Sequence, residues 1–301
     1  MITIFPSSED PATIDLSIII VSWNVRDLLM SCLRSVDRET YGIRYEIFVV
    51  DNASDDQSAQ MVRQQFPEVM LIANEVNRGF AAACNQALRR ARGRMILLLN
   101  PDTLIFNNAL EKLTQWMDER PKIGILGPQI LNTDLSIQPS TRTFPSLGIQ
   151  ILVILKLHRA FSFFPSVARY FGLNQALSPH RVDQVMGACF LIRRQTFQSI
   201  GYFDERFWIW FEEVDYCRRA ADAGWETWYT PIAQVMHQKG RSFEQVRAVT
   251  RQRHYNQSLF RYFQKHHTVV STTILSLFFP VSLFLALIVQ TLHLRLSIRR
   301  F

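Results

Sequence analysis

The first third of the chain alternates between continuous apolar runs and amphipathic stretches. The apolar runs are "LSIIIVSW" from Leu16, "EIFVV" from Glu46, "VMLIA" from Val69 and "RMILLL" from Arg94. Helical periodicity or alanine-rich sequence fills the stretches between them, at residues 27–36, 57–66 and 79–93. Strands that are apolar on both faces are typical of a parallel sheet covered on both sides. The pattern therefore predicts a doubly wound α/β unit.

Polar side chains follow each of these strands at the point where the strand ends. They are Ser22 to Asn24, Asp51 and Asn52, Asn74 to Asn77, and Asn100 to Asp102. The carboxyl ends of parallel strands meet at one edge of a sheet, which is where such folds bind ligands. We therefore expect these residues to share one rim.

The pattern becomes less regular after Asp102. It predicts a helix over residues 108–120, a strand near 123–126 and turn-rich sequence as far as Pro145. Further on, "VDQVMGACFLIRR" predicts a strand pair, or a strand and a turn. "FEEVDYCRRAADAG" predicts an amphipathic helix that ends at Gly224.

The segment from Thr268 to Leu292 carries no charged residue. As a helix it would be about 37 Å long, against a bilayer hydrocarbon core of about 30 Å. It fits a transmembrane helix, a re-entrant hairpin split at Pro280, or a buried core helix. Basic residues precede it from Arg241 onwards and follow it from Arg295, so charge does not fix its orientation. A second apolar stretch at 149–172 fits an interfacial amphipathic helix or an ordinary core helix.

The composition is typical of a globular protein, and the distribution of basic residues indicates contact with a membrane. The chain has 301 residues, of which 48% are hydrophobic and 20% charged, and a formal net charge of +7. The basic excess lies next to the apolar segment, which favours anionic lipid over nucleic acid as its partner. The four cysteines are scattered without a CxxC pair, and no secretory signal is evident, so we expect the protein to reside in the reducing cytosol.

The rim lacks the usual phosphate-binding loops. Neither a GxGxxG fingerprint nor a GxxxxGK[ST] loop occurs, so a bound diphosphate would need a metal or basic side chains. Asp102, after Asn100 and Pro101 at a strand end, is suited to hold a divalent cation. An aspartate in this context is also a common turn former.

Seven ordered segments resemble family 2 glycosyltransferases, particularly the rhamnosyltransferase-like branch. They are "SIIIVSWN", "VVDNASDD", "NRGFAAACNQAL", "LLLNPDT", "VMGACFLIRR", "GYFDERFWIWFEEVDYCRRAADAGW" and "PIAQVMH". They extend from about residue 17 to residue 242. The resemblance implies a GT-A fold, which is Rossmann-like with a mostly parallel sheet, and inverting transfer of a sugar from a nucleoside diphosphate donor.

The resemblance also implies which residues bind the donor and the metal. The nucleotide-sugar residues are Ser22, Trp23, Asn24, Asp51, Asn77, Arg78, Gly79, Asn100, Gly187 and Ala188. Asp102 and His237 would hold Mg²⁺ or Mn²⁺, with Asn100 standing where many members have the first aspartate of a DxD motif. Lys239 and Arg241 would lie near the phosphates, and Asp183 near the segment that closes over the sugar.

The catalytic base is expected in "FEEVDYCRR". Three acidic residues in the first turn of a helix are also favourable partners of the helix dipole and of Arg218 and Arg219. The preceding "FWIWF" would exclude water from a nearby carboxylate and raise its pKa. Matching the family's Glu-Asp-x-Asp motif implies Glu213 as the base, with Glu212 and Asp215 orienting neighbours.

These observations together predict a membrane-associated enzyme. We expect a glycosyltransferase domain over 1–242, with a nucleotide-sugar half at about 15–105 and an acceptor half at about 106–242. A basic juxtamembrane helix would follow at 243–267, then the apolar segment at 268–292 and a basic tail at 293–301. The expected reaction moves rhamnose or a related sugar to a lipid-linked glycan acceptor at the cytoplasmic face of the membrane, in cell-surface polysaccharide assembly. The alternative is a membrane-tethered nucleotide-sugar-binding scaffold without activity.

Overall fold

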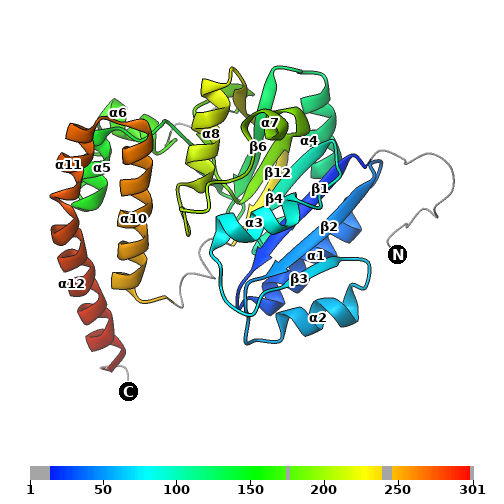
Figure 1. Cartoon of the computed structure of the whole chain (residues 1–301), viewed down its shortest axis with the longest axis horizontal. Coiled ribbons are helices and arrows are strands. Elements are labelled where there is room, and N and C mark those ends of the chain that lie inside the picture. Colours follow the sequence, from blue (N-terminus) through cyan, green and yellow to red (C-terminus); the bar gives the residue numbers. More distant parts are fainter. Residues whose placement is uncertain (1–13, 174–176, 239–245, 299–301) are drawn as a thin grey trace.

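A ten-stranded mixed sheet forms the centre of the protein (Figure 1). The computed structural model describes residues 14–173, 177–238 and 246–298. The main path runs β3-β2-β1-β4-β11-β6-β12-β5, with β7 beside β6 and β9 beside β12. The strands are β1 (Leu16–Ser22), β2 (Tyr45–Asp51), β3 (Met70–Ala73), β4 (Met95–Leu99), β5 (Thr103–Ile105), β6 (Ile123–Leu131), β7 (Ile137–Gln138), β9 (His180–Val182), β11 (Cys189–Arg193) and β12 (Glu226–His237). A separate pair joins β8 (Thr141–Arg142) to β10 (Gln184–Val185).

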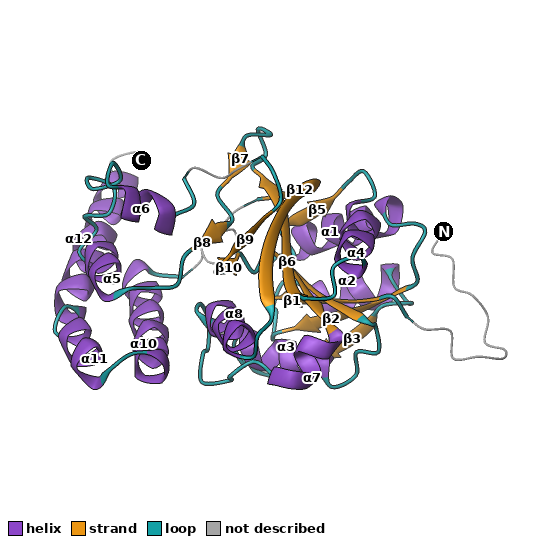
Figure 2. Ribbon diagram, turned by 90° about the horizontal axis from the view of Figure 1, so that it is seen from above, coloured by secondary structure: helices purple, strands orange, loops and turns teal. Residues whose placement is uncertain are grey.

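Helices cover both faces of this sheet (Figure 2). One face carries α1 (Arg26–Glu39), α2 (Ser58–Gln65) and α4 (Ala109–Asp118). The other carries α3 (Phe80–Leu88), α7 (Arg194–Ile200) and α8 (Glu212–Asp222). Successive strand residues point to opposite faces, so Ile18 and Ile20 pack under the first helix layer while Ile19 packs under the second. This two-sided burial explains why β1 and β2 carry apolar residues on both faces.

The predicted order of strands is confirmed in the first half of the chain. β1 pairs in parallel with β2 and with β4, and β2 pairs in parallel with β3. The sequence pattern predicted a strand in the segment that forms β11 but not its position in the sheet. β11 lies antiparallel between β4 and β6. Its insertion brings Ala188 to the rim, where the Asn100 amide donates a 2.9 Å hydrogen bond to the Ala188 carbonyl.

A helical unit lies beside the sheet domain (Figure 1). It consists of α5 (Leu147–Ile154), α6 (Pro165–Tyr170), α10 (Ala248–His266), α11 (Val269–Ser276) and α12 (Phe279–Ile298). Its core joins Ile154, Leu259, Phe263 and Leu275 to aromatic residues of the segment before α8. The stretch at 149–172 is two short helices and not one, because Lys156 takes a left-handed conformation after α5 and Pro165 starts a new helix.

The C-terminal apolar segment forms a helix that bends before Pro280. α11 ends at Ser276 and α12 begins at Phe279. By length and composition, Val269–Thr291 is able to cross a membrane, and 22% of its most apolar window is buried within the protein. The predicted boundary at residue 242 lies outside the described residues, and the division into domains stays a prediction.

Candidate active site

A cavity of about 510 Å³ opens at the carboxyl ends of the parallel strands. Its volume is in the range of sites that take a small molecule. Most residues expected at a binding or catalytic site line it: Trp23, Asn77, Gly79, Asn100, Asp102, Gly187, Ala188, Glu212, Glu213 and His237. Ser22, Asn24, Asp51, Arg78 and Asp215 are not in its lining. The tertiary structure thus gathers residues from six separate parts of the sequence around one space.

Ser22 and Asp51 lie just behind the cavity wall, at the ends of β1 and β2. They face each other in the strand register, and both are buried. Ser22 Oγ and Asp51 Oδ1 have no hydrogen-bond partner within the described residues. Buried polar oxygens are almost always bonded, so these two unbonded oxygens beside the cavity are an exception. Asn24 is bonded nearby, where its amide donates to Ser54 Oγ at 3.0 Å.

Asn52 organises the loop that contains Asn77 and Gly79. Its side-chain amide donates to Asn77 Oδ1 at 2.9 Å and to the Gly79 carbonyl at 3.2 Å, and its oxygen accepts from the Arg78 amide at 3.0 Å. Gly79 has a φ of 81°, and a Cβ added there would meet the Trp208 carbonyl at 2.5 Å. Glycine is therefore required for the chain to pass Trp208 at the entrance of α3.

Asp102 and His237 meet because β12 pairs with β5. The register places His237 opposite Thr103, and the distance from Asp102 Oδ1 to His237 Nε2 is 3.3 Å. Gln138 Oε1 lies 2.8 Å from His237 Nδ1 and can only accept, so it fixes the proton of a neutral imidazole on Nδ1. The Nε2 lone pair then faces the Asp102 carboxylate. Two electron-pair donors at this distance fit a divalent cation between them.

Asp102 and His237 alone do not complete the coordination shell of a divalent cation. Within the described part of the chain, no three His, Cys, Asp or Glu side chains converge on one point. Mg²⁺ and similar cations are often held by one or two carboxylates together with substrate phosphates and water. The residues present therefore fit a cation that binds together with a diphosphate.

Glu212 and Glu213 start α8 against an aromatic wall. Trp210 and Phe211 precede them with left-handed φ values of 61° and 68°, a strained pair of the kind found at functional sites. Glu212 Oε2 and Glu213 Oε2 are buried without hydrogen-bond partners in the described residues. Burial raises the pKa of Glu212 well above its usual range, and the charge of Glu213 adds to this. Burial also raises the pKa of Glu213, while backbone amides and Arg142 partly offset the rise.

The model of the family described as Glycosyltransferase like family 2 matches residues 11–256. The chain belongs to this family. The glycosyltransferase is 30% identical over 212 residues to the N-acetylglucosaminyl-diphospho-decaprenol L-rhamnosyltransferase of Mycobacterium tuberculosis, across 65% of this chain and 67% of that relative. It is 26% identical over 215 residues to the low-salt glycan biosynthesis hexosyltransferase Agl10 of Haloferax volcanii, across 68% of this chain and 61% of the relative.

A solved structure shares the fold of this glycosyltransferase. GalNAc-T7, crystallised with UDP, GalNAc and Mn²⁺, superimposes with a TM-score of 0.55 and 17% identity. The match covers 76% of this chain and 44% of that one. The predicted family and the GT-A fold are thereby confirmed.

Several polar residues of the glycosyltransferase site were not predicted to bind the donor or the metal. Asn52 was expected at the rim from its place at a strand end, but its part in holding the loop of Asn77 was not. Arg142 and Gln138 belong to a turn-rich segment without periodicity, so nothing in the sequence indicated that Arg142 lines the cavity or that Gln138 fixes His237. Tyr255 comes from α10, far along the chain.

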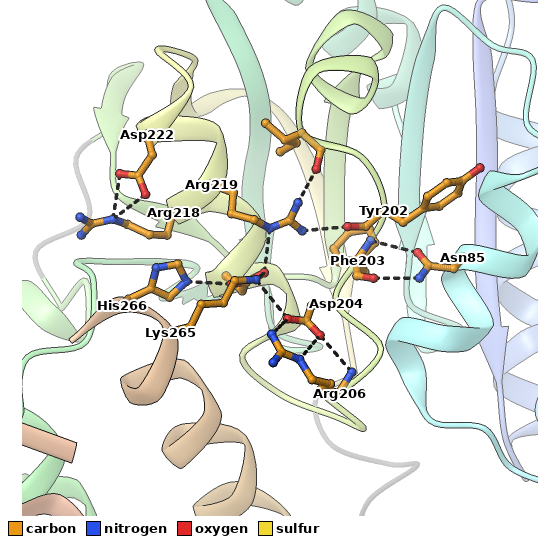
Figure 3. Close-up of polar contacts among 12 residues, drawn as sticks. Asn85, Tyr202, Phe203, Asp204, Arg206, Arg218, Arg219, Asp222, Lys265 and His266 are labelled. Atoms are coloured by element: carbon orange, nitrogen blue, oxygen red, sulfur yellow. Dashed lines mark hydrogen bonds and ion pairs between the residues drawn. The ribbon is translucent and has the colours of Figure 1, made fainter. Parts of the chain in front are cut away.

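Asp215 of the glycosyltransferase does not line the cavity and contacts α10 through Lys265 and His266, which are labelled in Figure 3. Its carboxylate is fully buried and accepts from Arg219 Nε at 2.9 Å and His266 Nε2 at 2.7 Å. Lys265 Nζ lies 2.8 Å from Asp215 Oδ1 and 3.1 Å from Asp204 Oδ2. Burial alone would raise the pKa of Asp215, but the hydrogen bonds from His266 and Lys265 and the charge of Arg219 hold it below its usual range. Asp215 therefore fastens α8 to the helical unit.

Replacing Asp215 with asparagine is expected to lower the free energy of unfolding by about 3 kcal/mol, because it leaves Lys265 and Arg219 without their buried carboxylate. Asp222→Asn is the matched control, since Asp222 pairs with Arg218 at the same spacing on α8 but is exposed. Its expected effect is below about 0.5 kcal/mol. Urea unfolding of both variants measures the difference, and equal losses would contradict the role given to Asp215.

The same cluster gives a direction for the pH dependence of stability. A carboxylate with a lowered folded-state pKa contributes stability that is present above its unfolded pKa of about 3.9. That contribution disappears as the pH falls through the folded-state pKa. The difference in unfolding free energy between wild type and Asp215→Asn should therefore shrink in acid.

Proposed function

We propose that the protein transfers rhamnose or a related sugar, with inversion, from a nucleoside diphosphate donor to a lipid-linked glycan acceptor at the cytoplasmic face of the membrane. One observation carries this proposal: a single cavity holds both the Asp102 and His237 pair and the partly exposed Glu213. A metal-binding pair and a base of raised pKa in one space are the two groups that such a transfer needs.

The donor half of the cavity supports nucleotide-sugar binding. Trp23 and Asn52, which follow Ser22 and Asp51 directly, line it, so the ends of β1 and β2 border the space for the nucleoside. The loop of Asn77 and Gly79, at the start of α3, lines the same cavity, and its backbone is held by Asn52 and Trp208. When bound at Asp102 and His237, Mg²⁺ or Mn²⁺ would stabilise the charge gained by the leaving nucleoside diphosphate.

Glu213 is the base in this proposal. Its carboxylate takes the proton of the acceptor hydroxyl as that oxygen bonds to the anomeric carbon of the sugar. The bond from that carbon to the diphosphate oxygen breaks, and its electron pair leaves with the nucleoside diphosphate. Gly187 lies beside Glu213, since a Cβ built at Gly187 would be 3.9 Å from Glu213 Cγ. The space left by this glycine is available to the sugar or the hydroxyl.

Arg142 is suited to hold the phosphates of the acceptor. It lines the cavity near Glu213, and its guanidinium lies 5.1 Å from the Phe171 ring centroid at the end of α6. It thus joins the catalytic carboxylate to the helical unit. The mycobacterial relative is named for an acceptor in which a diphosphate joins sugar and lipid. Arginine binds phosphate oxygens in a bidentate geometry, so a diphosphate-linked lipid acceptor fits this position.

Replacing Arg142 with glutamine is expected to raise the KM for a lipid-diphosphate acceptor about tenfold or more, because a charge-assisted contact of about 1.5–3 kcal/mol is lost. The KM for the donor should change little. Arg181→Gln is the control, since Arg181 is an exposed arginine of β9 outside the cavity lining. A larger change in the donor KM than in the acceptor KM would place Arg142 on the donor side.

The test of the function is a donor panel with purified full-length protein. Thermal shift with dTDP, UDP and GDP sugars identifies the donor, and nucleoside diphosphate release with Mg²⁺ or Mn²⁺ and a lipid-diphosphate glycan measures transfer. Release that depends on the acceptor supports the proposal. Tight donor binding without release, despite an acceptor that related enzymes use, would favour a nucleotide-sugar-binding scaffold.

A further inference from the structure

The apolar C-terminal helix has two different faces. Its buried face carries Thr272, Leu275, Ser282 and Ala286, which pack into the protein. The opposite face is exposed and apolar, and we define the outer stripe as Val270, Ile274, Leu277, Val281, Phe284 and Ile288. The stripe residues recur at intervals of three and four along α11 and α12 and so lie along one side of the helix. One face of the helix therefore packs against the protein, and the other leaves apolar side chains exposed.

The buried face is attached to α10 from Leu275 to Gln290. Near the end of α11, Leu275 packs in the core with Leu259 and Phe263 of α10. In α12, Asn256 donates a 2.7 Å hydrogen bond to Ser282 Oγ, and the Val249 amide donates to Gln290 Oε1 at 3.3 Å. These contacts run in opposite directions along the two chains, so the apolar helix is antiparallel to α10.

α10 is in turn fixed to the wall of the cavity. Ser258 Oγ donates to the Ile209 carbonyl at 2.7 Å, Tyr255 lines the cavity, and Lys265 and His266 hold Asp215. α10 thus lies between the apolar helix and the sheet domain, as Figure 1 shows. If the apolar helix crossed a bilayer in this arrangement, α10 would enter the hydrocarbon with Arg251, Arg253 and Arg261. Charged side chains at that depth are strongly unfavourable.

The turn between α5 and α6 extends the exposed apolar surface. Leu157, Phe163 and Phe164 are exposed there, and both figures place α5 beside α11 and α12. The segments 147–172 and 248–291 contain no aspartate or glutamate, whereas Arg159, Arg169 and Arg253 are exposed within them. Lys265 is occupied by Asp204 and Asp215. An apolar surface with basic and no acidic residues is complementary to anionic lipid.

We propose that α11 and α12 lie in the plane of an anionic membrane, with the outer stripe and the turn between α5 and α6 inserted at the boundary of head groups and acyl chains, and do not cross it. The proposal rests on the proposed function in that the acceptor is taken to be lipid-linked. It differs from both the transmembrane and the re-entrant prediction. Tyr170 of α6 and Tyr255 of α10 line the cavity, so the unit that meets the lipid also forms a wall of the active site.

Topology is tested with the full chain expressed in a bacterial host. An epitope tag that follows Phe301 should be digested by protease in inverted membrane vesicles, together with the catalytic domain, and be protected in spheroplasts. Digestion in spheroplasts would mean that the helix crosses the membrane and would overturn the proposal. Recovery of the full-length protein in the soluble fraction, without membrane, would overturn it equally.

The stripe itself is tested by adding charge to it. Leu277→Asp and Phe284→Asp should each reduce co-sedimentation with vesicles of phosphatidylcholine and phosphatidylglycerol about tenfold, because an ionised side chain cannot enter the acyl boundary. Tyr41→Asp is the matched control, since Tyr41 is 63% exposed in the turn before β2, away from the helical unit. The wild type should bind phosphatidylcholine alone more weakly.

Two results of the vesicle experiment would contradict the proposal. The first is unchanged vesicle binding by both stripe variants. The other is a wild-type dimer that the stripe variants convert to monomer with vesicle binding intact, which would assign the face to a second copy of the chain. Donor-induced thermal shift confirms that each variant is folded. Nucleoside diphosphate release with a detergent-dispersed acceptor reports the transferase function separately, because it does not require the membrane.

Discussion

Replacing Glu213 with glutamine is expected to lower turnover by about 10²–10⁴-fold while the affinity for the donor stays within a few-fold of wild type. Glutamine keeps the size of the side chain and removes the proton acceptor. Glu213 is the partly exposed member of the buried carboxylate pair at the start of α8, and it contacts the space beside Gly187. Single-turnover kinetics with excess enzyme measures the chemical step, and donor titration by calorimetry measures binding.

Glu212→Gln is the matched control for this change. Glu212 is more deeply buried than Glu213, and the charge of Glu213 raises its pKa further, so Glu212 stays protonated to higher pH and is less available to accept a proton. Its replacement should cost much less turnover than that of Glu213. A larger loss of turnover in Glu212→Gln than in Glu213→Gln would mean that Glu212 is the base.

The pH profile follows from the same carboxylate. A base must be deprotonated to act, and burial raises the pKa of Glu213 above its usual range. Turnover should therefore rise with pH through that raised pKa, and the rise should come at a higher pH than for an exposed glutamate, whose pKa is about 4.3. Because Arg142 lowers the pKa of Glu213, the acidic limb of Arg142→Gln should move to higher pH.

Replacing Asp102 with asparagine is expected to abolish metal-dependent transfer, with a loss of at least about 10²-fold, because stabilisation of a developing charge by a cation is worth several kcal/mol. Asp102 is buried and supplies the carboxylate that faces His237 Nε2. Electron paramagnetic resonance of Mn²⁺ with nucleoside diphosphate present measures binding directly, apart from turnover.

The control for Asp102 is Asp134→Asn, which alters an exposed aspartate in the turn between β6 and β7. It should leave Mn²⁺ binding unchanged. Gln138→Leu provides a second comparison, since it removes the acceptor that holds the His237 Nδ1 proton, and it should weaken Mn²⁺ binding about 10–100-fold. If Asp102→Asn bound Mn²⁺ with the affinity of the wild type, Asp102 would not be a metal ligand.

The sequence determined the features that depend on local pattern. Continuous apolar runs predicted β1 to β4. Strands buried on both faces admit few polar residues, which holds for β1, β2 and β4, whereas β3 is a partly exposed edge strand. The residues just after these strands were predicted to share a rim, because parallel strands end at one edge. The position of Asp102 and the acidic start of α8 followed from the motifs alone.

Only the tertiary structure decided the contacts between distant segments. The pairing of β12 with β5 joins His237 to Asp102, and the partners of Asp215 lie 50 and 51 residues along the chain, at Lys265 and His266. Likewise, the apolar composition of α11 and α12 does not reveal which face packs on α10 and which faces outward, because both are apolar. A side chain's neighbours across the fold are set by chain topology, which hydrophobic periodicity does not encode.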